Sequence, residues 1–175
     1  AEAEAVILAC GLALQDLADG VTLAPVRGQA SWAAGAERPA PAAWGGYVLP
    51  TRDGVLFGAT HDRGETTCEV RDADQVRNLE TLAIARPALA ARLAGSTLAG
   101  RASIRATTAD RLPLAGPLEA PGLFGLGGFG SRGFSWAPLL AEHVAALAVG
   151  APSPLPGPLA EIVDPGRFAR RAARR

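Results

Sequence analysis

The sequence contains no methionine, no lysine and only two cysteines among its 175 residues. Cys10 and Cys68 lie far apart and show no CxxC or Cys/His spacing, so neither a disulfide framework nor a zinc site is indicated. We expect two inert thiols and no metal. The 17 basic residues, all arginine, balance 17 acidic ones, which excludes a disordered polyelectrolyte and a chain that is basic throughout. Any contact with nucleic acid must therefore be local.

Long apolar segments are missing as well. No run approaches the roughly 18 to 20 residues that a membrane-spanning helix needs, and the first residues lack the basic start of a signal peptide. We therefore expect a cytoplasmic protein with no membrane contact. Hydrophobic residues still make up 49% of the chain, enough for one substantial core or two small ones. Because no methionine precedes the first predicted strand, we expect a segment of a longer protein.

Strand patterns dominate the first part of the chain. A short buried strand is predicted at Val6–Ala9, and Val21–Ala34 predicts either two strands or one bent strand. The Pro/Ala-rich residues 35–43 predict a loop. Asp53-Gly54 between two apolar runs is a strong local signal for an antiparallel hairpin. Further strands are predicted at 97–108 and, after a proline-rich connection, at 122–126.

Helical periodicity begins at Asp72, where Asp72 or Asp74 is a plausible N-cap. Pro87 ends this helix and begins another that closes at Gly95. The last clear helix is expected to have Ser135 as its cap, Pro138 in its first turn and Gly150 at its end, before a linker at 152–158. The predicted apolar faces contain Val76, Leu79, Leu82 and Ala83 in the first helix, and Leu139, Leu140, Val144 and Leu147 in the last.

Residues 125–130 form a literal GxGxxG between a predicted strand and a predicted helix. The dinucleotide fingerprint also requires an acidic residue about 20 positions later, and residues 145–155 contain none. This disfavours the first turn of a Rossmann domain. Two interpretations stay open: a purely structural turn, or a turn that lets the backbone approach a flat or anionic ligand at a helix N-terminus.

Arg105 and Arg132 each interrupt a stretch of apolar or small residues. A buried guanidinium is costly unless it is paired, and its planar fork fits a carboxylate. Each arginine therefore either pairs internally with an acid such as Asp110 or holds the carboxylate of a ligand. Arg27 admits the same two interpretations.

The histidines and the C-terminal tail give weaker signals. His61 and His143 lack the spacing of a catalytic triad or a metal site, and we expect a surface turn for His61 and a partly buried helix position for His143. The tail carries arginines at the spacing of one helical face, which are either solvated or in contact with an RNA backbone. These arginines are Arg167, Arg170, Arg171, Arg174 and Arg175.

Four segments taken together resemble a known family: Val26–Gln29, Leu56–Thr60, Gly100–Pro113 and Gly127–Pro138. They are similar to the C-terminal half of the FAD-dependent module of the bacterial tRNA 5-methylaminomethyl-2-thiouridine biosynthesis bifunctional proteins, within the D-amino acid oxidase and glycine oxidase superfamily. The resemblance covers about residues 5–172. The two long segments are specific to the tRNA-modifying branch, whereas RGQ and GAT occur widely in the superfamily.

The resemblance implies an α+β fragment of a larger fold: a mixed, largely antiparallel substrate-domain sheet with helices, plus the closing strand and helix of an FAD-binding α/β domain. Residues 1–20 would end the first FAD-domain portion, 21–108 would form the substrate-binding sheet domain, 109–150 would return to the FAD domain, and 151–175 would be a linker and basic tail. The family's N-terminal FAD-binding and methyltransferase portions would lie upstream. We therefore expect this chain alone to bind FAD poorly and to be inactive.

The activity implied by the family is oxidation of 5-carboxymethylaminomethyl uridine at the tRNA wobble position. FAD takes a hydride from the glycine-like carbon, the imine hydrolyses, and glyoxylate is released. Arg105 matches a carboxylate-clamping arginine and Arg132 a second active-site arginine, so both are expected to be catalytic and substrate-binding. Tyr47 matches a substrate-facing tyrosine. The turn expected along the flavin comprises Gly128, Phe129, Gly130, Ser131, Arg132, Gly133 and Phe134.

Two other functions remain open. A fragment of a small-molecule amine or amino-acid oxidase, similar to glycine oxidase, would use the same arginines without any dependence on RNA. A catalytically silent binding domain would present a sheet face to a partner. Internal pairing of both Arg105 and Arg132 with acids would favour the silent domain.

Overall fold

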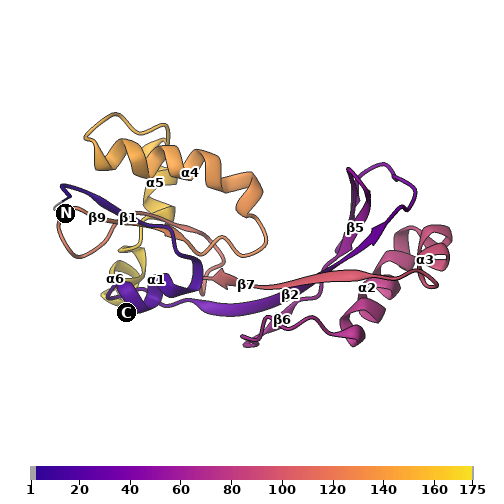
Figure 1. Cartoon of the computed structure of the whole chain (residues 1–175). Helices are drawn as coiled ribbons and strands as arrows, with labels where there is room; N and C mark the ends of the chain where they lie inside the picture. Colours follow the sequence, from indigo (N-terminus) through magenta and orange to yellow (C-terminus); the bar gives the residue numbers. More distant parts are fainter. Residues whose placement is uncertain (1–2, 175) are drawn as a thin grey trace. The chain divides into compact units, whose positions relative to one another are not determined.

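The computed structural model describes residues 3–174 and divides the chain into two compact units (Figure 1). Unit 1 combines the residues up to Pro25 with those from Arg105 onward, and unit 2 consists of Val26–Ile104. The secondary structure is a mixture of helices with largely antiparallel strands. This confirms the expected α+β class. Within residues 3–174, no helix has the length and apolar character needed to cross a bilayer.

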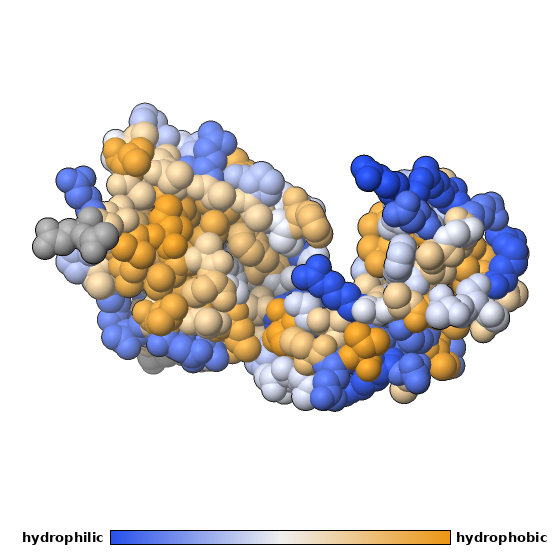
Figure 2. Space-filling model, viewed as in Figure 1, coloured by the Kyte–Doolittle hydropathy of each residue, from blue (hydrophilic) through white to orange (hydrophobic). Residues whose placement is uncertain are grey.

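Unit 1 contains a three-stranded sheet in the order β1 (Val6–Leu8), β9 (Leu123–Gly127) and β8 (Leu114–Pro117). β1 runs parallel to β9, and β8 runs antiparallel to it. The prediction that the first strand is buried is wrong: β1 lies at the edge of the sheet, and Val6 and Ile7 are 44% and 42% exposed. Apolar surface gathers over the region of β1 and β9 in Figure 2. Prolines at both ends of β8 concealed that strand from pattern analysis.

The helices of unit 1 are η1 (Gly11–Ala13), α1 (Leu14–Leu17), α4 (Gly133–Ala148), α5 (Gly157–Val163) and α6 (Arg167–Ala172). The expected N-terminus of α4 is wrong, since Arg132 occupies the N-cap, Ser135 lies in the first turn and Pro138 lies inside the helix. The linker expected at 152–158 is cut short by α5.

Two apolar clusters form the core of unit 1. In α4, Leu140 and Val144 are buried as expected, whereas Leu139 is 47% exposed. The first cluster contains Leu14, Ala18, Leu23, Ala106 and Leu114, and the second contains Ala115, Leu140, Val144, Leu155 and Val163.

Unit 2 is built on a six-stranded sheet in the order β3-β4-β5-β2-β6, with β7 also paired to β2. The strands are β2 (Ala24–Ala34), β3 (Ala42–Ala43), β4 (Tyr47–Thr51), β5 (Gly54–Gly58), β6 (Asp62–Arg63) and β7 (Ala99–Thr107). β2 is one strand, which settles the two alternatives for Val21–Ala34. The predicted hairpin is confirmed by the β4–β5 register. A Cβ on Gly54 would lie 2.0 Å from the Ala33 carbonyl oxygen, so only glycine fits this turn.

The helices of unit 2 are α2 (Asp72–Ala85) and α3 (Pro87–Leu93), divided at Pro87 as predicted. The predicted caps are wrong, because Arg71 is the N-cap and both Asp72 and Asp74 lie in the first turn. Carboxylates in the first turn interact favourably with the helix dipole and stabilise the helix. The predicted apolar face is also wrong in part. Leu82 is buried, but Val76 is 54% exposed.

The buried face of α2 is mostly polar. Asp74, Gln75 and Asn78 join Leu82 on that face. Asn78 donates to the carbonyl oxygen of Gln29 at 2.9 Å and to Ser31 Oγ at 2.8 Å. Hydrogen bonds to β2 therefore satisfy the buried polar groups, and they determine which side of the helix faces inward.

Candidate functional site

The glycine-rich turn that follows β9 packs against the end of β7. Gly128 and Gly130 have φ of +67° and +57°, values that glycine adopts without steric cost. Gly130 N donates to the carbonyl oxygen of Ala106 at 2.9 Å, and Phe129 forms an isolated antiparallel bridge with Thr107. A Cβ on Gly128 would lie 2.9 Å from Thr108 Cγ2. The two glycines thus allow the turn to approach the strand closely.

This packing brings the turn beside Arg105. Arg105 lies in β7 and is partly buried. It directly precedes Ala106, whose carbonyl oxygen accepts the hydrogen bond from Gly130 N. Beyond the turn, Arg132 and Phe134 are exposed, and Phe134 exposes its whole side chain at 103% of the reference area. The structure therefore gathers an arginine, a glycine-rich turn and the start of a 16-residue helix in one unit.

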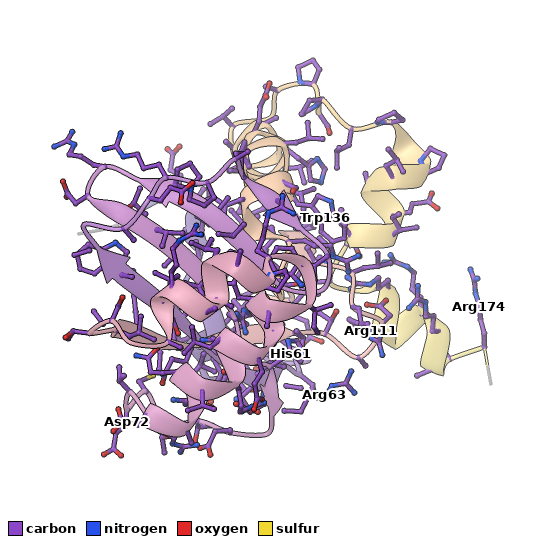
Figure 3. All side chains as sticks on the ribbon, turned by 90° about the vertical axis from the view of Figure 1, so that its right-hand side faces the viewer. His61, Arg63, Asp72, Arg111, Trp136 and Arg174 are labelled. Atoms are coloured by element: carbon purple, nitrogen blue, oxygen red, sulfur yellow. The ribbon has the colours of Figure 1, made fainter. Side chains whose placement is uncertain are left out.

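Arg132 is held by neutral groups. Its Nη2 donates to the carbonyl oxygen of Arg111, and its guanidinium lies 4.1 Å from the centroid of the Trp136 ring. Figure 3 labels Arg111 and Trp136 in unit 1. In the described part of the chain, no acidic side chain forms an ion pair with Arg132. The internal pairing considered for this residue is therefore not found.

Arg27 shows the opposite behaviour. Its side chain is fully buried in unit 2, and Nη1 lies 2.6 Å from Asp74 Oδ2. Nη2 donates to Gln29 Oε1 at 3.1 Å, and Nε donates to the carbonyl oxygen of Thr67 at 3.1 Å. These contacts settle the two interpretations of Arg27 in favour of an internal ion pair. Asp74 also pairs with Arg77 at 2.8 Å.

Tyr47 belongs to unit 2. It lies in β4, partly buried, and is paired in register with Ala43 on one side and Gly58 on the other. Arg105, Arg132 and the glycine-rich turn belong to unit 1. The predicted site residues are thus divided between the two units.

Most arginines of the tail form ion pairs within unit 1. Arg167 is 3% exposed and makes a two-pronged bond to Asp110, with both N···O distances 2.9 Å. Arg171 lies 2.6 Å from the same carboxylate, and Arg170 lies 2.8 Å from Asp164. Neither alternative considered for the tail, solvation or contact with an RNA backbone, holds for Arg167, because its side chain is buried. Arg175 lies outside the described residues.

Hydrogen bonds to Asp110 lower the pKa of its carboxyl group well below the usual 3.8, with Arg167 as the largest cause. Arg167 and Asp110 are 57 positions apart in the sequence. No local pattern connects residues at that separation, so sequence analysis assigned no partner to Arg167.

The histidines and cysteines provide no second site. His143 is 3% exposed and its Nδ1 lies 2.7 Å from Ser153 Oγ, while His61 is exposed. Burial lowers the His143 pKa from 6.5, and the charge of Asp164 opposes this effect. Cys10 and Cys68 are free and exposed. Over residues 3–174, no group of three or more histidine, cysteine or acidic side chains is placed to hold a metal ion.

Comparison with known proteins identifies the class. Residues 1–147 match the model of the family described as FAD dependent oxidoreductase, and the chain belongs to this family. It is 56% identical to the tRNA 5-methylaminomethyl-2-thiouridine biosynthesis bifunctional protein MnmC of Caulobacter sp. (strain K31) over 99% of this chain, and 57% identical to the protein of the same name from Caulobacter vibrioides over 96%. These matches confirm the resemblance found in the sequence. The chain spans 29% and 28% of the length of these two relatives.

Solved structures share the fold. Glycine oxidase from Geobacillus kaustophilus matches with a TM-score of 0.74 at 26% identity, over 93% of this chain and 45% of that one. Iminodiacetate oxidase from Chelativorans sp. BNC1 matches with a TM-score of 0.75 at 23% identity, over 94% of this chain and 47% of that one. The cofactor named for the family is FAD.

Proposed function

We propose that the complete enzyme removes the carboxymethyl group from 5-carboxymethylaminomethyl uridine at the tRNA wobble position, and that this chain carries part of its flavin and substrate sites. The observation that carries the proposal is the 56% identity to a tRNA-modifying relative over 99% of the chain. The small-molecule oxidases are matched at 26% and 23% identity. A tRNA substrate is consistent with a cytoplasmic enzyme.

The glycine-rich turn fits a flat cofactor. Gly128 and Gly130 adopt positive φ angles without steric cost, and the N-terminus of α4 presents N–H groups at the positive end of a helix dipole. Phe134 exposes its apolar ring at this end, as expected for a surface that a ligand covers. The residues that would hold FAD are Gly128, Phe129, Gly130, Ser131, Arg132, Gly133 and Phe134.

In the proposed reaction, FAD supplies the acceptor for a hydride. The substrate loses that hydride from its carboxymethyl carbon and a proton from its amine nitrogen, which leaves a C=N bond. Water adds to this bond, the C–N bond breaks, and glyoxylate and 5-aminomethyl uridine are released.

The chain's own residues bind and orient the substrate. Arg105 would clamp the carboxylate with its planar fork. Arg132, which has no acidic partner within residues 3–174, would supply a second positive charge. Tyr47 would contact the substrate, as the family resemblance implies. Such positioning lowers the entropic barrier of the transfer step.

The test is an FAD titration of this chain and of a longer chain extended upstream, followed by flavin absorbance. We expect FAD binding by the longer chain only, and bleaching of the flavin when tRNA bearing 5-carboxymethylaminomethyl uridine is added without oxygen. The same tRNA lacking the carboxymethyl group is the matched control and should cause no bleaching.

Two results would contradict the proposal. Bleaching by small carboxymethylamines but not by the modified tRNA would instead support a small-molecule oxidase. Absence of FAD binding by the longer chain would support a catalytically silent binding domain.

A further inference from the structure

The loop that connects β7 to β8 is held by the carboxylate of Asp110. Asp110 Oδ1 accepts hydrogen bonds from Leu112 N and from Thr108 Oγ1, both at 3.1 Å. Between them, Arg111 has φ of +61°, a left-handed conformation that is uncommon for a non-glycine residue. Such a conformation persists only where the surrounding structure determines it. The backbone conformation of the loop therefore depends on the side chains that hold the Asp110 carboxylate in place.

Two arginines of α6 hold Asp110: the exposed Arg171, at 2.6 Å from Oδ2, and the buried Arg167, which makes most of the contacts. Its Nε and Nη2 donate to the two carboxylate oxygens at 2.9 Å, and Nη2 also donates to the carbonyl oxygen of Leu112 at 2.9 Å. Nη1 donates to the carbonyl oxygens of Val163 and Asp164, both at 3.2 Å. All five N–H groups of the guanidinium are thus used. A side chain held at five points and 3% exposed has one orientation.

The same loop contacts Arg132 at its other face. The carbonyl oxygen of Arg111 accepts the hydrogen bond from Arg132 Nη2, and Trp136 lies against the guanidinium. Arg111 and Trp136 can be located in Figure 3. The single loop between β7 and β8, residues 108–113, therefore joins the buried arginine of α6 to the exposed arginine at the start of α4.

We propose that Arg167 is a positioning residue: by clamping Asp110 it fixes the Arg111 carbonyl group, which in turn orients the guanidinium of Arg132 over Trp136. The consequence for substrate binding rests on the proposed function, which places Arg132 in the active site. The geometric part does not depend on that function. The proposal also gives the buried arginine of the tail a role that requires no RNA.

The geometric part is tested by ¹⁹F NMR on the full-length protein without flavin, labelled with 5-fluorotryptophan. The Trp136 resonance is assigned by its loss in Trp136→Phe. Arg132→Ala should shift this resonance because the cation leaves the ring face, and Arg167→Ala should shift it in the same direction. Arg170→Ala is the matched control, since it removes an exposed arginine of the same helix that pairs with Asp164, and it should leave the resonance unchanged.

An unshifted Trp136 resonance in Arg167→Ala, together with a shift in Arg132→Ala, would overturn the proposal. If Arg167→Ala does not yield folded protein, Arg167→Lys takes its place. Lysine keeps the charge but cannot donate as a planar fork to the carboxylate and the carbonyl groups together. It should give a smaller shift in the same direction, and no shift would again overturn the proposal.

The consequence for substrate is tested on the flavin-loaded enzyme. Arg167→Ala should raise the KM for the carboxymethylaminomethyl-uridine tRNA about fivefold, with kcat changed less than about twofold. The double variant with Arg132→Ala should have the same KM as Arg132→Ala alone, because both act through one guanidinium. Additive effects would overturn the proposal. A shifted Trp136 resonance with no change of KM in either single variant would uphold the positioning and refute the proposed role of Arg132.

Discussion

Removal of Arg27 should destabilise unit 2 more than removal of any exposed arginine. The side chains of Arg27 and Asp74 are 0% and 4% exposed, and their N···O distance is 2.6 Å. Loss of one partner from a buried pair costs about 3–5 kcal/mol, because the remaining charge stays in a medium of low polarity. Arg77 still contacts the other oxygen of Asp74 at 2.8 Å. We therefore expect Arg27→Ala to lower the free energy of unfolding by about 3 kcal/mol, at the lower end of that range.

Urea unfolding followed by tryptophan fluorescence measures this effect, because Trp32 and Trp44 both lie in unit 2. A loss of about 3 kcal/mol corresponds to a change of more than 100-fold in the unfolding equilibrium constant. Arg92→Ala is the matched control: its pair with Glu37 is equally short at 2.6 Å, but the two side chains are 56% and 67% exposed. Exposed pairs contribute about 0–1 kcal/mol.

A loss for Arg27→Ala no larger than that for Arg92→Ala would refute the reasoning. A second variant separates the buried charge from the lost packing. Arg27→Met combined with Asp74→Leu replaces the pair by apolar side chains, and it should be more stable than Arg27→Ala alone. If the double variant is the less stable of the two, the unpaired charge is not the cause.

Three further predictions concern unit 1. Gly128→Ala should cost about 1–2 kcal/mol of stability in urea unfolding because of its positive φ and its contact with Thr108, whereas Gly95→Ala, which meets nothing within 4 Å, should cost almost nothing; equal losses would contradict this. Because burial lowers the His143 pKa from 6.5, the unfolded chain binds more protons, and stability should fall as pH drops below about 6.5. His143→Gln should flatten that part of the pH profile, and an unaltered profile would assign it to other groups. Arg105→Ala in the complete enzyme should raise the substrate KM and slow flavin reduction, measured by stopped-flow absorbance; unchanged kinetics would exclude the carboxylate clamp.

Local chemistry made several elements predictable. Asp53-Gly54 specifies a tight turn wherever it stands between apolar runs, and Pro87 divides two helices because it lacks an N–H group and clashes with the preceding turn. The glycine-rich turn before α4 was also predictable, because few residues other than glycine adopt its backbone angles. The segments that placed the chain in its family were 26–29, 56–60 and the two long motifs at 100–113 and 127–138.

Tertiary structure decided the features that depend on distant partners. Arg27 and Asp74 are separated by 47 positions, and Arg167 and Asp110 by 57. The residues adjacent to Arg27 and to Arg167 in the sequence do not indicate whether each arginine forms an ion pair or stays solvated. The inward face of α2 was mispredicted because hydrogen bonds to β2 stabilise polar side chains where periodicity favours apolar ones. Sequence by itself therefore determined the turns, the helix boundary at Pro87 and the family, whereas only strand register and packing determined which charges are buried together.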